Sequence, residues 1–238
     1  MKVNISERLR NVAEAVEKCN TVADIGCDHG FLPIYLVLTN RASRAIAMDL
    51  RKEPVRRAGE HIASFNLSDK ITTRISNGLE ALSRGEADTI TITGMGGMLM
   101  RDILIAGNDK LMDGNKFVFS PQSDIDTFRK YLDDNGFVIT KEKVIFEAPR
   151  FYFIINATLK RGEKMNLSDL ELRFGKDFHL GDTKVLQDFL TKELYNNGIL
   201  CGQLEDEERK GNLSVKPKLD YLKKEQEYRE SALKMISK

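Results

Sequence analysis

The sequence predicts an α/β fold in which a parallel sheet ends in an antiparallel hairpin and is followed by a small helical unit. Between Thr21 and Leu159, short β-prone runs alternate with segments of helical periodicity, which is the pattern of a parallel sheet covered by helices. Two long strand-like runs then follow each other with no room for a crossover helix. Beyond Arg161 the chain becomes charged and helical, which indicates a second, smaller domain.

Alternating strands and helices account for the first part of the chain. The expected strands cover residues 21–25, 44–48, 71–75, 89–92 and 116–119. The expected helices cover residues 31–38, 54–65, 97–106 and 123–135. Pro54 is tolerated in the first turn of its helix, and Ser123 is the expected N-cap of the last one.

The end of the sheet separates two classes of nucleotide-binding domain. Residues 137–146 and 151–159 both resemble strands, and only residues 147–150 lie between them, so they form an antiparallel hairpin. S-adenosylmethionine-dependent methyltransferases usually end their parallel sheet in such a hairpin, whereas NAD-binding domains normally end with a parallel strand. This pattern favours methyl transfer over hydride transfer.

The C-terminal segment predicts a helical hairpin with a coiled-coil-like seam. Long helices are expected over residues 182–204 and 217–236, with a polar loop between them. Apolar positions that could form the seam are Val185, Phe189, Leu194, Leu219, Leu222, Leu233 and Ile236. Gly198 and Gly202 weaken the end of the first helix. We therefore expect two domains, residues 1–160 and residues 161–238.

Composition describes a globular chain without a membrane segment. Of the 238 residues, 41% are hydrophobic and 31% are charged, and no apolar run approaches the roughly 20 residues that a bilayer requires. Residues 1–16 are charged and amphipathic, so they do not form a secretory signal. We expect a cytoplasmic monomer with no membrane partner.

Cysteine spacing and net charge limit the possible ligands. Cys19, Cys27 and Cys201 are odd in number and lack close ligand spacing, which argues against a disulfide framework and against a zinc site. We expect no bound metal. The formal net charge is +1, so a site for a polyanion would have to come from local clusters of basic residues.

The most informative stretch follows the first strand and reads Ala-Asp-Ile-Gly-Cys-Asp-His-Gly over residues 23–30. Gly26 and Gly30 permit a sharp turn close to a ligand, and the next helix directs its positive end toward that ligand. A dinucleotide site would need glycine where Asp28 stands. Asp28 is hostile to a pyrophosphate but suits the ammonium group of S-adenosylmethionine.

Two further strand ends complete a nucleoside site. Asp49 ends the second strand, 23 positions after Gly26, which is the expected offset for an acid that binds the ribose hydroxyls. Asn77 and Gly78 follow the third strand, where the Asn77 amide could contact the adenine edge. An ordinary Asn-Gly turn would give the same pattern.

The loop after the fourth strand contains three glycines in four positions, Gly94, Gly96 and Gly97, around Met95. Methyltransferases that act on exocyclic amines often carry an Asp or Asn followed by two prolines here, and this chain does not. A glycine-rich turn leaves backbone groups and open space beside the sulfonium, which suits a flat base entering edge-on. A tight turn without a function remains the alternative.

With these segments in view, the chain resembles the bacterial tRNA (adenine(22)-N1)-methyltransferases. The resemblance spans nearly the whole chain and rests on five segments, residues 6–9, 23–29 with 32–33, 77–79, 93–97 and 121–122. It implies a Rossmann-like class I methyltransferase sheet with S-adenosylmethionine as cofactor, a helical domain that contacts tRNA, and methyl transfer to N1 of adenine 22. Departures from the family pattern are Cys27, Asp49 and the pair Pro149 and Arg150.

The strand-end analysis and the resemblance together assign roles. Expected cofactor contacts are Gly26, Cys27, Asp28, His29, Asp49, Leu50, Asn77, Gly78 and Gly94. Expected catalytic residues are Asp28, Gly94 and Met95. Expected substrate contacts are Arg8, His29, Gly96, Gly97 and Tyr152, of which Arg8 and Tyr152 follow from the resemblance alone.

The expected mechanism needs no strong general base. N1 of neutral adenine carries an in-plane lone pair, so catalysis consists of aligning it with the methyl group. Water or Asp28 could accept the proton that leaves the product. Methylation of another RNA base or of a small molecule is an alternative with the same cofactor features, and a non-catalytic RNA-binding protein is a more remote one.

Overall fold

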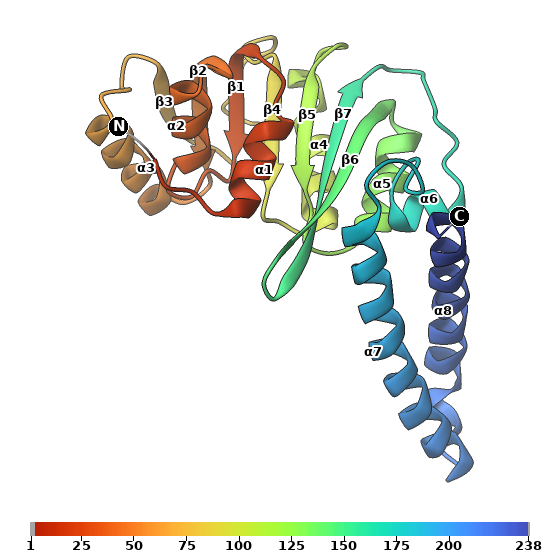
Figure 1. Ribbon diagram of the computed structural model, residues 1–238. Helices are drawn as coiled ribbons and strands as arrows, with labels where there is room; N and C mark the ends of the chain where they lie inside the picture. The colour runs from red at the N-terminus through yellow and green to blue at the C-terminus, as the bar shows by residue number, and fades with distance from the viewer. Residues whose placement is uncertain (1–2, 238) are drawn as a thin grey trace. The chain divides into compact units, whose positions relative to one another are not determined.

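The computed structural model describes residues 3–237, in which seven strands form one sheet. The strands are β1 (Cys19–Ile25), β2 (Ala42–Asp49), β3 (Ile71–Ile75), β4 (Thr89–Thr93), β5 (Lys116–Ser120), β6 (Phe137–Glu147) and β7 (Arg150–Leu159). Their order in the sheet is β3-β2-β1-β4-β5-β7-β6 (Figure 1). The expected strands and the hairpin are therefore confirmed, with half of the strand ends moved by one or two residues.

The order of the strands places a switch point at the centre of the sheet. β1 pairs in parallel with β2 on one side and with β4 on the other. The chain thus leaves β1 in opposite directions, and loops at the carboxyl ends of β1 and β4 separate there and leave room for a ligand. β7 pairs antiparallel to both β5 and β6.

Helices cover both faces of the sheet (Figure 1). One layer contains α1 (Glu7–Ala15), α2 (Phe31–Leu38) and α3 (Lys52–Ser64), and the other contains α4 (Gly97–Ala106), the short η1 (Asn108–Lys110) and α5 (Ile125–Asp134). Alternation along β2 serves both layers, because Ala45 and Ala47 pack toward the first and Ile46 and Met48 toward the second. Burial on both faces explains why the parallel strands are apolar throughout.

The start of α5 differs from the expectation. Asp124 is the N-cap, with a positive φ of 53°, and no side chain caps this end. The Ser123 hydroxyl donates to the carboxylate of Asp124 instead, at 2.7 Å. Aspartate is one of the few residues that adopt left-handed backbone angles readily. The N-cap is therefore Asp124, one residue after Ser123.

The smaller unit is Ser168–Lys238, and the larger one is Met1–Leu167. The division falls after Leu167 rather than after residue 160, because the buried Asp133 carboxylate accepts hydrogen bonds from the backbone N–H groups of Met165, Asn166 and Leu167. These three bonds hold the segment that follows β7 against α5. The chain is released from the larger unit only beyond them.

The smaller unit contains α6 (Asp169–Phe174), α7 (Lys184–Arg209), η2 (Leu213–Val215) and α8 (Lys216–Ile236). A capping box between Ser168 and Glu171 starts α6, which the sequence pattern did not predict. α7 continues through Gly198 and Gly202 to Arg209, because packing outweighs the low helix propensity of two glycines. No helix within residues 3–237 is long and apolar enough to cross a membrane.

The seam of the helical hairpin lies one position away from the expected one on α7. The buried α7 side chains are Leu186, Leu190, Asn197, Cys201 and Leu204, whereas Val185, Phe189 and Leu194 are only half-buried. Cys201 and Leu204 form one apolar cluster with Leu219 of α8. The buried Asn197 amide donates to the Leu222 carbonyl at 2.8 Å, and this polar contact within the seam hid the correct periodicity.

One buried ion pair joins α5 to the hairpin. The Arg129 side chain is fully buried, donates to the Glu142 carboxylate at 2.8 and 2.9 Å, and lies 5.2 Å from the centre of the Phe153 ring. Removing one partner of a buried pair leaves the other charge without compensation in a medium of low dielectric constant. The pair therefore favours one position of α5 against β6.

We expect Glu142→Ala to lower the free energy of unfolding by about 3–5 kcal/mol, because the buried Arg129 guanidinium would lose its carboxylate partner. Urea denaturation followed by circular dichroism measures this loss. Glu163→Ala is the control, since Glu163 pairs with Lys160 on the surface and should change stability by no more than about 1 kcal/mol. Equal effects of the two substitutions would contradict the role of burial.

Candidate cofactor and substrate site

A cleft of about 440 Å³ opens at the carboxyl ends of the central strands. Eight of the predicted residues line it: Arg8, Gly26, Cys27, Asp28, His29, Asp49, Gly94 and Met95. They come from α1, from the ends of β1 and β2, and from the loop after β4. The topology thus collects residues that are far apart in the sequence at the switch point between β1 and β4.

The turn after β1 is held in an unusual conformation. Gly26, Asp28 and Gly30 all have positive φ angles, of 77°, 48° and 72°. The N–H groups of Gly26 and Cys27 both donate to the Met48 carbonyl, at 2.8 and 2.9 Å. A Cβ atom on Gly30 would lie 3.0 Å from that of Ala58, so glycine also allows α3 to approach.

Asp24 is a site residue that the sequence analysis missed. Its carboxylate is buried, lines the cleft and accepts a hydrogen bond from the Thr91 hydroxyl at 2.7 Å. Burial raises the pKa of Asp24 from its ordinary 3.8 to about 6; the Thr91 hydrogen bond lowers this pKa and the charge of Asp49 raises it. Its place at the end of the first strand was the signal that could have identified it.

Asp49 lies at the end of β2 with its side chain buried. Its Oδ1 atom accepts a hydrogen bond from the Arg51 backbone N–H at 2.9 Å, and the Arg51 side chain lies 3.5 Å away. These contacts orient the carboxylate toward the cleft, which Asp49 lines together with Asp24 and Asp28. Three carboxylates on one cleft favour a ligand with positive charge and hydroxyl groups.

His29 belongs to an aromatic cluster at the mouth of the cleft. Its Nε2 atom lies 3.5 Å from the Asp28 carboxylate, and its buried Nδ1 has no hydrogen-bond partner among the described residues. The His61 ring stacks on Phe31 with centroids 4.8 Å apart. Its Nδ1 lies 2.9 Å from the His29 carbonyl oxygen, so this nitrogen carries a proton and donates.

Arg8 closes the opposite side of the cleft. Its guanidinium carbon lies 5.3 Å from the centre of the Tyr152 ring. The buried Nη1 atom has no hydrogen-bond partner within residues 3–237. A Cβ on Gly94 would lie 4.0 Å from this atom and 3.9 Å from the Gln122 amide nitrogen, so both donors face the glycine. Gln122 thus joins the site.

The remaining predicted residues do not line the cleft. Leu50 is exposed, and the Asn77 amide donates to Glu80 at 2.8 Å. Gly78 packs against Ile103, where an added Cβ would lie 3.0 Å from a methyl carbon. Tyr152 reaches the cleft only through Arg8.

The glycine-rich loop is packed more tightly than its sequence suggests. An added Cβ on Gly97 would lie 2.7 Å from the Asp124 carbonyl oxygen, and one on Gly96 would lie 2.7 Å from the Ser123 hydroxyl. The N–H groups of Gly94 and Gly97 already donate to the carbonyls of Ser120 and Ser123. The expectation of open space and free backbone donors is therefore wrong at Gly97, because the start of α5 fills that space.

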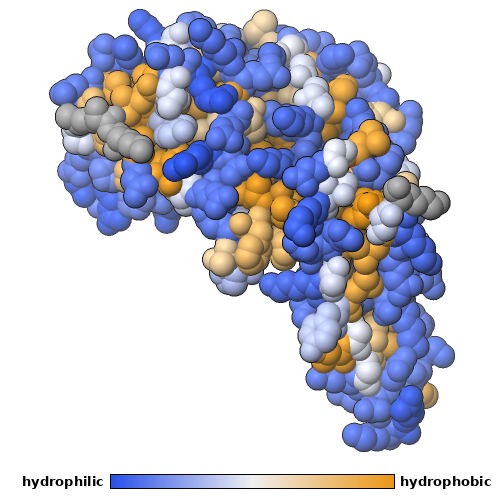
Figure 2. All heavy atoms as spheres, viewed as in Figure 1, coloured by the Kyte–Doolittle hydropathy of each residue, from blue (hydrophilic) through white to orange (hydrophobic). Residues whose placement is uncertain are grey.

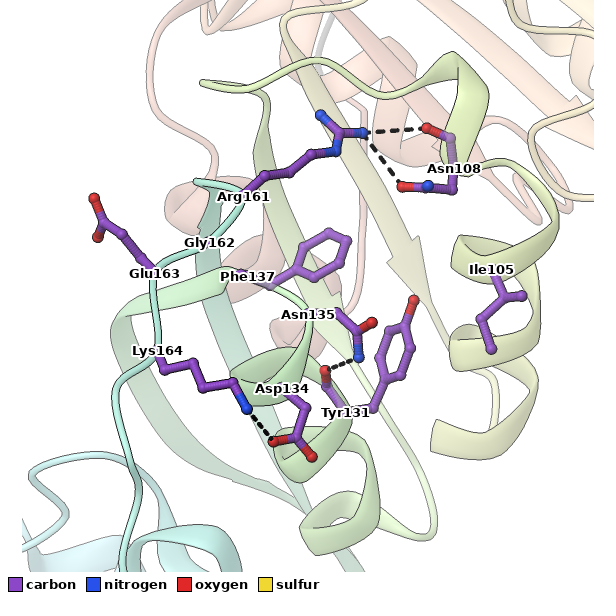
Figure 3. A pocket seen from close by; sticks show the side chains of 11 residues that line it. Ile105, Asn108, Tyr131, Asp134, Asn135, Phe137, Arg161, Gly162, Glu163 and Lys164 are labelled. Carbon is purple, nitrogen blue, oxygen red and sulfur yellow. Dashed lines mark hydrogen bonds and ion pairs between the residues drawn. The ribbon is translucent and has the colours of Figure 1, made fainter.

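A second cavity, of about 410 Å³, lies away from these residues (Figure 3). Its charged side chains already have partners, because Arg161 contacts Asn108 and Lys164 contacts Asp134. It contains none of the carboxylates at the carboxyl edge of the sheet. Within residues 3–237, no group of three potential ligand side chains could hold a metal ion.

Comparison with known proteins relates the chain to methyltransferases. Residues 5–155 match the family described as a methyltransferase domain. A relative from Bacillus subtilis (strain 168), the tRNA (adenine(22)-N(1))-methyltransferase, is 36% identical over 156 residues, which span 66% of this chain and 66% of the relative. The alignment thus covers just under two thirds of that protein.

Two solved structures extend the likeness to both units of the chain. The crystal structure of the B. subtilis tRNA methyltransferase TrmK is 28% identical, with a TM-score of 0.85, and covers 98% of this chain and 100% of that one. A Streptococcus pneumoniae protein in complex with S-adenosyl-L-methionine is 29% identical, with a TM-score of 0.84, and covers 97% of this chain and 100% of that one.

The raised pKa of Asp24 predicts a measurable pH dependence of stability. Between pH 3.8 and about 6 the native state holds a proton that the unfolded chain releases, so the free energy of unfolding falls as the pH rises through this window. Asp24→Asn removes this dependence. We expect the free energy of unfolding of the variant to rise, relative to that of the wild type, by up to roughly 3 kcal/mol between pH 4 and pH 7.

Urea denaturation at several pH values measures this difference. Asp177→Asn is the control, because Asp177 is exposed and its substitution should leave the shape of the pH profile unchanged. Parallel profiles for the wild type and Asp24→Asn would refute the raised pKa.

Proposed function

We propose that this chain transfers a methyl group from S-adenosylmethionine to N1 of adenine 22 in tRNA. The premise is its family, because the chain belongs to the methyltransferase-domain family and within it to the tRNA (adenine(22)-N1)-methyltransferases. The observation that supports this best is the cleft at the switch point. It combines three carboxylates with a guanidinium nitrogen that has no partner among the described residues.

The residues of the cleft fit S-adenosylmethionine. Asp28 and Asp24 suit its ammonium and sulfonium charges, and Asp49 retains a carboxylate oxygen that can accept from the ribose hydroxyls. Gly26, Cys27 and Gly94 bring backbone close to the ligand, and His29 can donate to its carboxylate. Leu50, Asn77 and Gly78 lie beyond the cleft lining, and we assign them to the adenine end of the cofactor.

When bound, the cofactor supplies an electrophilic methyl group on a sulfonium. The chain's own contribution is orientation, because adenine N1 is a nucleophile without prior deprotonation. Met95 and Gly94 form the wall beside Gly26, where a Cβ would lie within 2.2 Å of the Met95 methyl carbon. Asp28 is exposed to solvent and can accept the proton that leaves the product.

To the acceptor side we assign Arg8 and His29, which line the cleft, together with Tyr152, which contacts Arg8, and Gly96 in the loop after β4. Arg8 stacks on Tyr152 and keeps Nη1 available as a donor toward an adenine. Gln122 adds an amide opposite Gly94, which can pair with the edge of a base. Gly97 contributes indirectly, by letting α4 begin against the start of α5.

Because N1 lies on the Watson-Crick edge, the target adenine has to leave its stack before it can enter this cleft. The smaller unit offers exposed basic side chains for tRNA phosphates. Lys210 follows the last residue of α7, and Lys216, Lys218 and Lys224 lie within the first nine residues of α8. We assign RNA binding to this unit and expect affinity to fall as salt rises. We further propose a cytoplasmic monomer.

The first experiment tests the reaction itself. Purified protein is incubated with labelled S-adenosylmethionine and unmodified tRNA that carries adenine at position 22, and the nucleosides are then analysed. We expect the label in 1-methyladenosine, and none when adenine 22 is replaced. Cofactor binding without labelled RNA would refute the tRNA substrate and favour a small-molecule acceptor.

A second prediction concerns the charge of Asp28. Asp28→Asn keeps the left-handed backbone, which asparagine tolerates, but removes the negative charge. We expect the dissociation constant for S-adenosylmethionine, measured by calorimetry, to rise by about two- to fivefold, as a partly exposed charge pair allows. Asp177→Asn is a matched control, because Asp177 also has a positive φ, of 53°. Unchanged binding and turnover in Asp28→Asn would exclude a role for this carboxylate.

A further inference from the structure

The β6–β7 hairpin extends well past the rest of the sheet. β5 pairs with β7 only as far as Phe119 and Ile155, whereas β6 and β7 remain paired as far as Glu147 and Arg150. Five residues separate Ile155 from Arg150, which corresponds to about 16 Å at roughly 3.3 Å per residue. Figure 1 shows this end of the hairpin, residues 144–153, projecting from the sheet. We call it the hairpin arm.

The hairpin arm projects on the side of the cofactor cleft. β7 runs antiparallel to β5, so its first residues lie beyond the carboxyl end of β5. The Arg8 backbone N–H donates to the Glu147 carboxylate at 3.0 Å, and the Arg8 guanidinium lies over the Tyr152 ring. Arg8 also lines the cleft. One residue thus connects the arm to the wall of the site.

The two faces of the hairpin arm differ in their surroundings. Ile145 and Tyr152 lie opposite each other and pack into the apolar cluster on the α1 side. Phe146 and Phe151 are paired one position further out, so they lie on the other face. Their rings are 4.8 Å apart, and the Phe146 residue is 46% exposed.

The turn of the hairpin arm carries an exposed cation. Arg150 is exposed and follows directly on the turn of the hairpin. Figure 2 shows an apolar patch at the projecting end of the hairpin, with hydrophilic surface around it. Arg150 is paired with Glu147, one position beyond Phe146 and Phe151, so its side chain lies on the same face of the arm as Tyr152. The arm thus presents an aromatic ring on one face and a cation on the other. Proteins use such rings to stack unpaired bases and such cations to neutralise phosphates.

We propose that the hairpin arm is a stacking platform for a tRNA nucleotide beside the methylated adenine, with Phe146 as the stacking ring and Arg150 as the phosphate contact. This inference rests on the proposed function. Extrusion of the target base leaves its neighbours without a stacking partner. Phe146 lies within about 16 Å of the sheet edge. It can supply a stacking partner for a neighbouring base, because consecutive bases along a strand are close together.

Three single variants separate stacking from simple apolar contact. Phe146→Leu keeps an apolar side chain but removes the aromatic face, whereas Phe146→Trp keeps the face. Ile105→Ala is the matched control, because Ile105 is an exposed apolar residue on α4, at the cavity of Figure 3. For each variant, the dissociation constant for tRNA is measured by fluorescence anisotropy with S-adenosylhomocysteine present, together with KM and kcat.

We expect Phe146→Leu to weaken tRNA binding and raise KM for tRNA by about tenfold, with cofactor affinity and the thermal unfolding temperature unchanged. Phe146→Trp and Ile105→Ala should both bind like the wild type. Wild-type affinity in Phe146→Leu would overturn the proposal and indicate a protein or apolar partner for the arm. A uniform loss in all three variants, Ile105→Ala included, would also overturn it.

Salt dependence tests the second half of the platform. Arg150→Gln should reduce the slope of log affinity against log salt by about one contact, because one fewer phosphate is neutralised. An unchanged slope would remove Arg150 from the proposal. A wild-type enzyme that methylates adenine 22 while the arm variants bind normally would refute only this inference, whereas a wild type that does not label tRNA would refute the proposed function itself.

Discussion

The site depends on one constraint, the left-handed turn that follows β1. Three positive φ angles within five residues, at Gly26, Asp28 and Gly30, turn the chain sharply between β1 and α2. Two hydrogen bonds from Gly26 and Cys27 to the Met48 carbonyl then tie the turn to the end of β2. Asp28 on the turn and Asp49 on β2 consequently line one cleft, and the N-terminal end of α2 points into it.

The carboxylates collected there explain the chemistry better than any single residue does. Asp24, Asp28 and Asp49 converge at one edge of a protein with a net charge of only +1. Burial disfavours the ionised form of Asp24 and so raises its pKa. A cationic ligand relieves that cost, so binding and ionisation of the cleft support each other. No general base is needed in such a site, because a sulfonium is already activated and orientation supplies the rate.

Around this centre, the other elements act through position. The buried pair of Arg129 and Glu142 secures the hairpin against α5, and the hairpin in turn carries Tyr152 to the side of Arg8. Asp133 holds residues 165–167 against the larger unit and so defines where the helical unit begins. Arg129, Glu142 and Asp133 do not line the cleft. Arg129 and Glu142 act on it only through the hairpin, whose Tyr152 lies beside Arg8.

The sequence by itself determined the strand–helix alternation, the terminal hairpin and eight residues of the cleft, because periodicity and strand-end motifs are local properties. Tertiary structure alone decided the rest. Gln122 became a site residue because β5, which precedes it, pairs with β4, and Gly97 proved to be a packing contact because α5 fills the space beside it. The seam of α7 shifted because a buried Asn197 found a partner on α8. Such outcomes depend on which surfaces meet, and no local pattern records that.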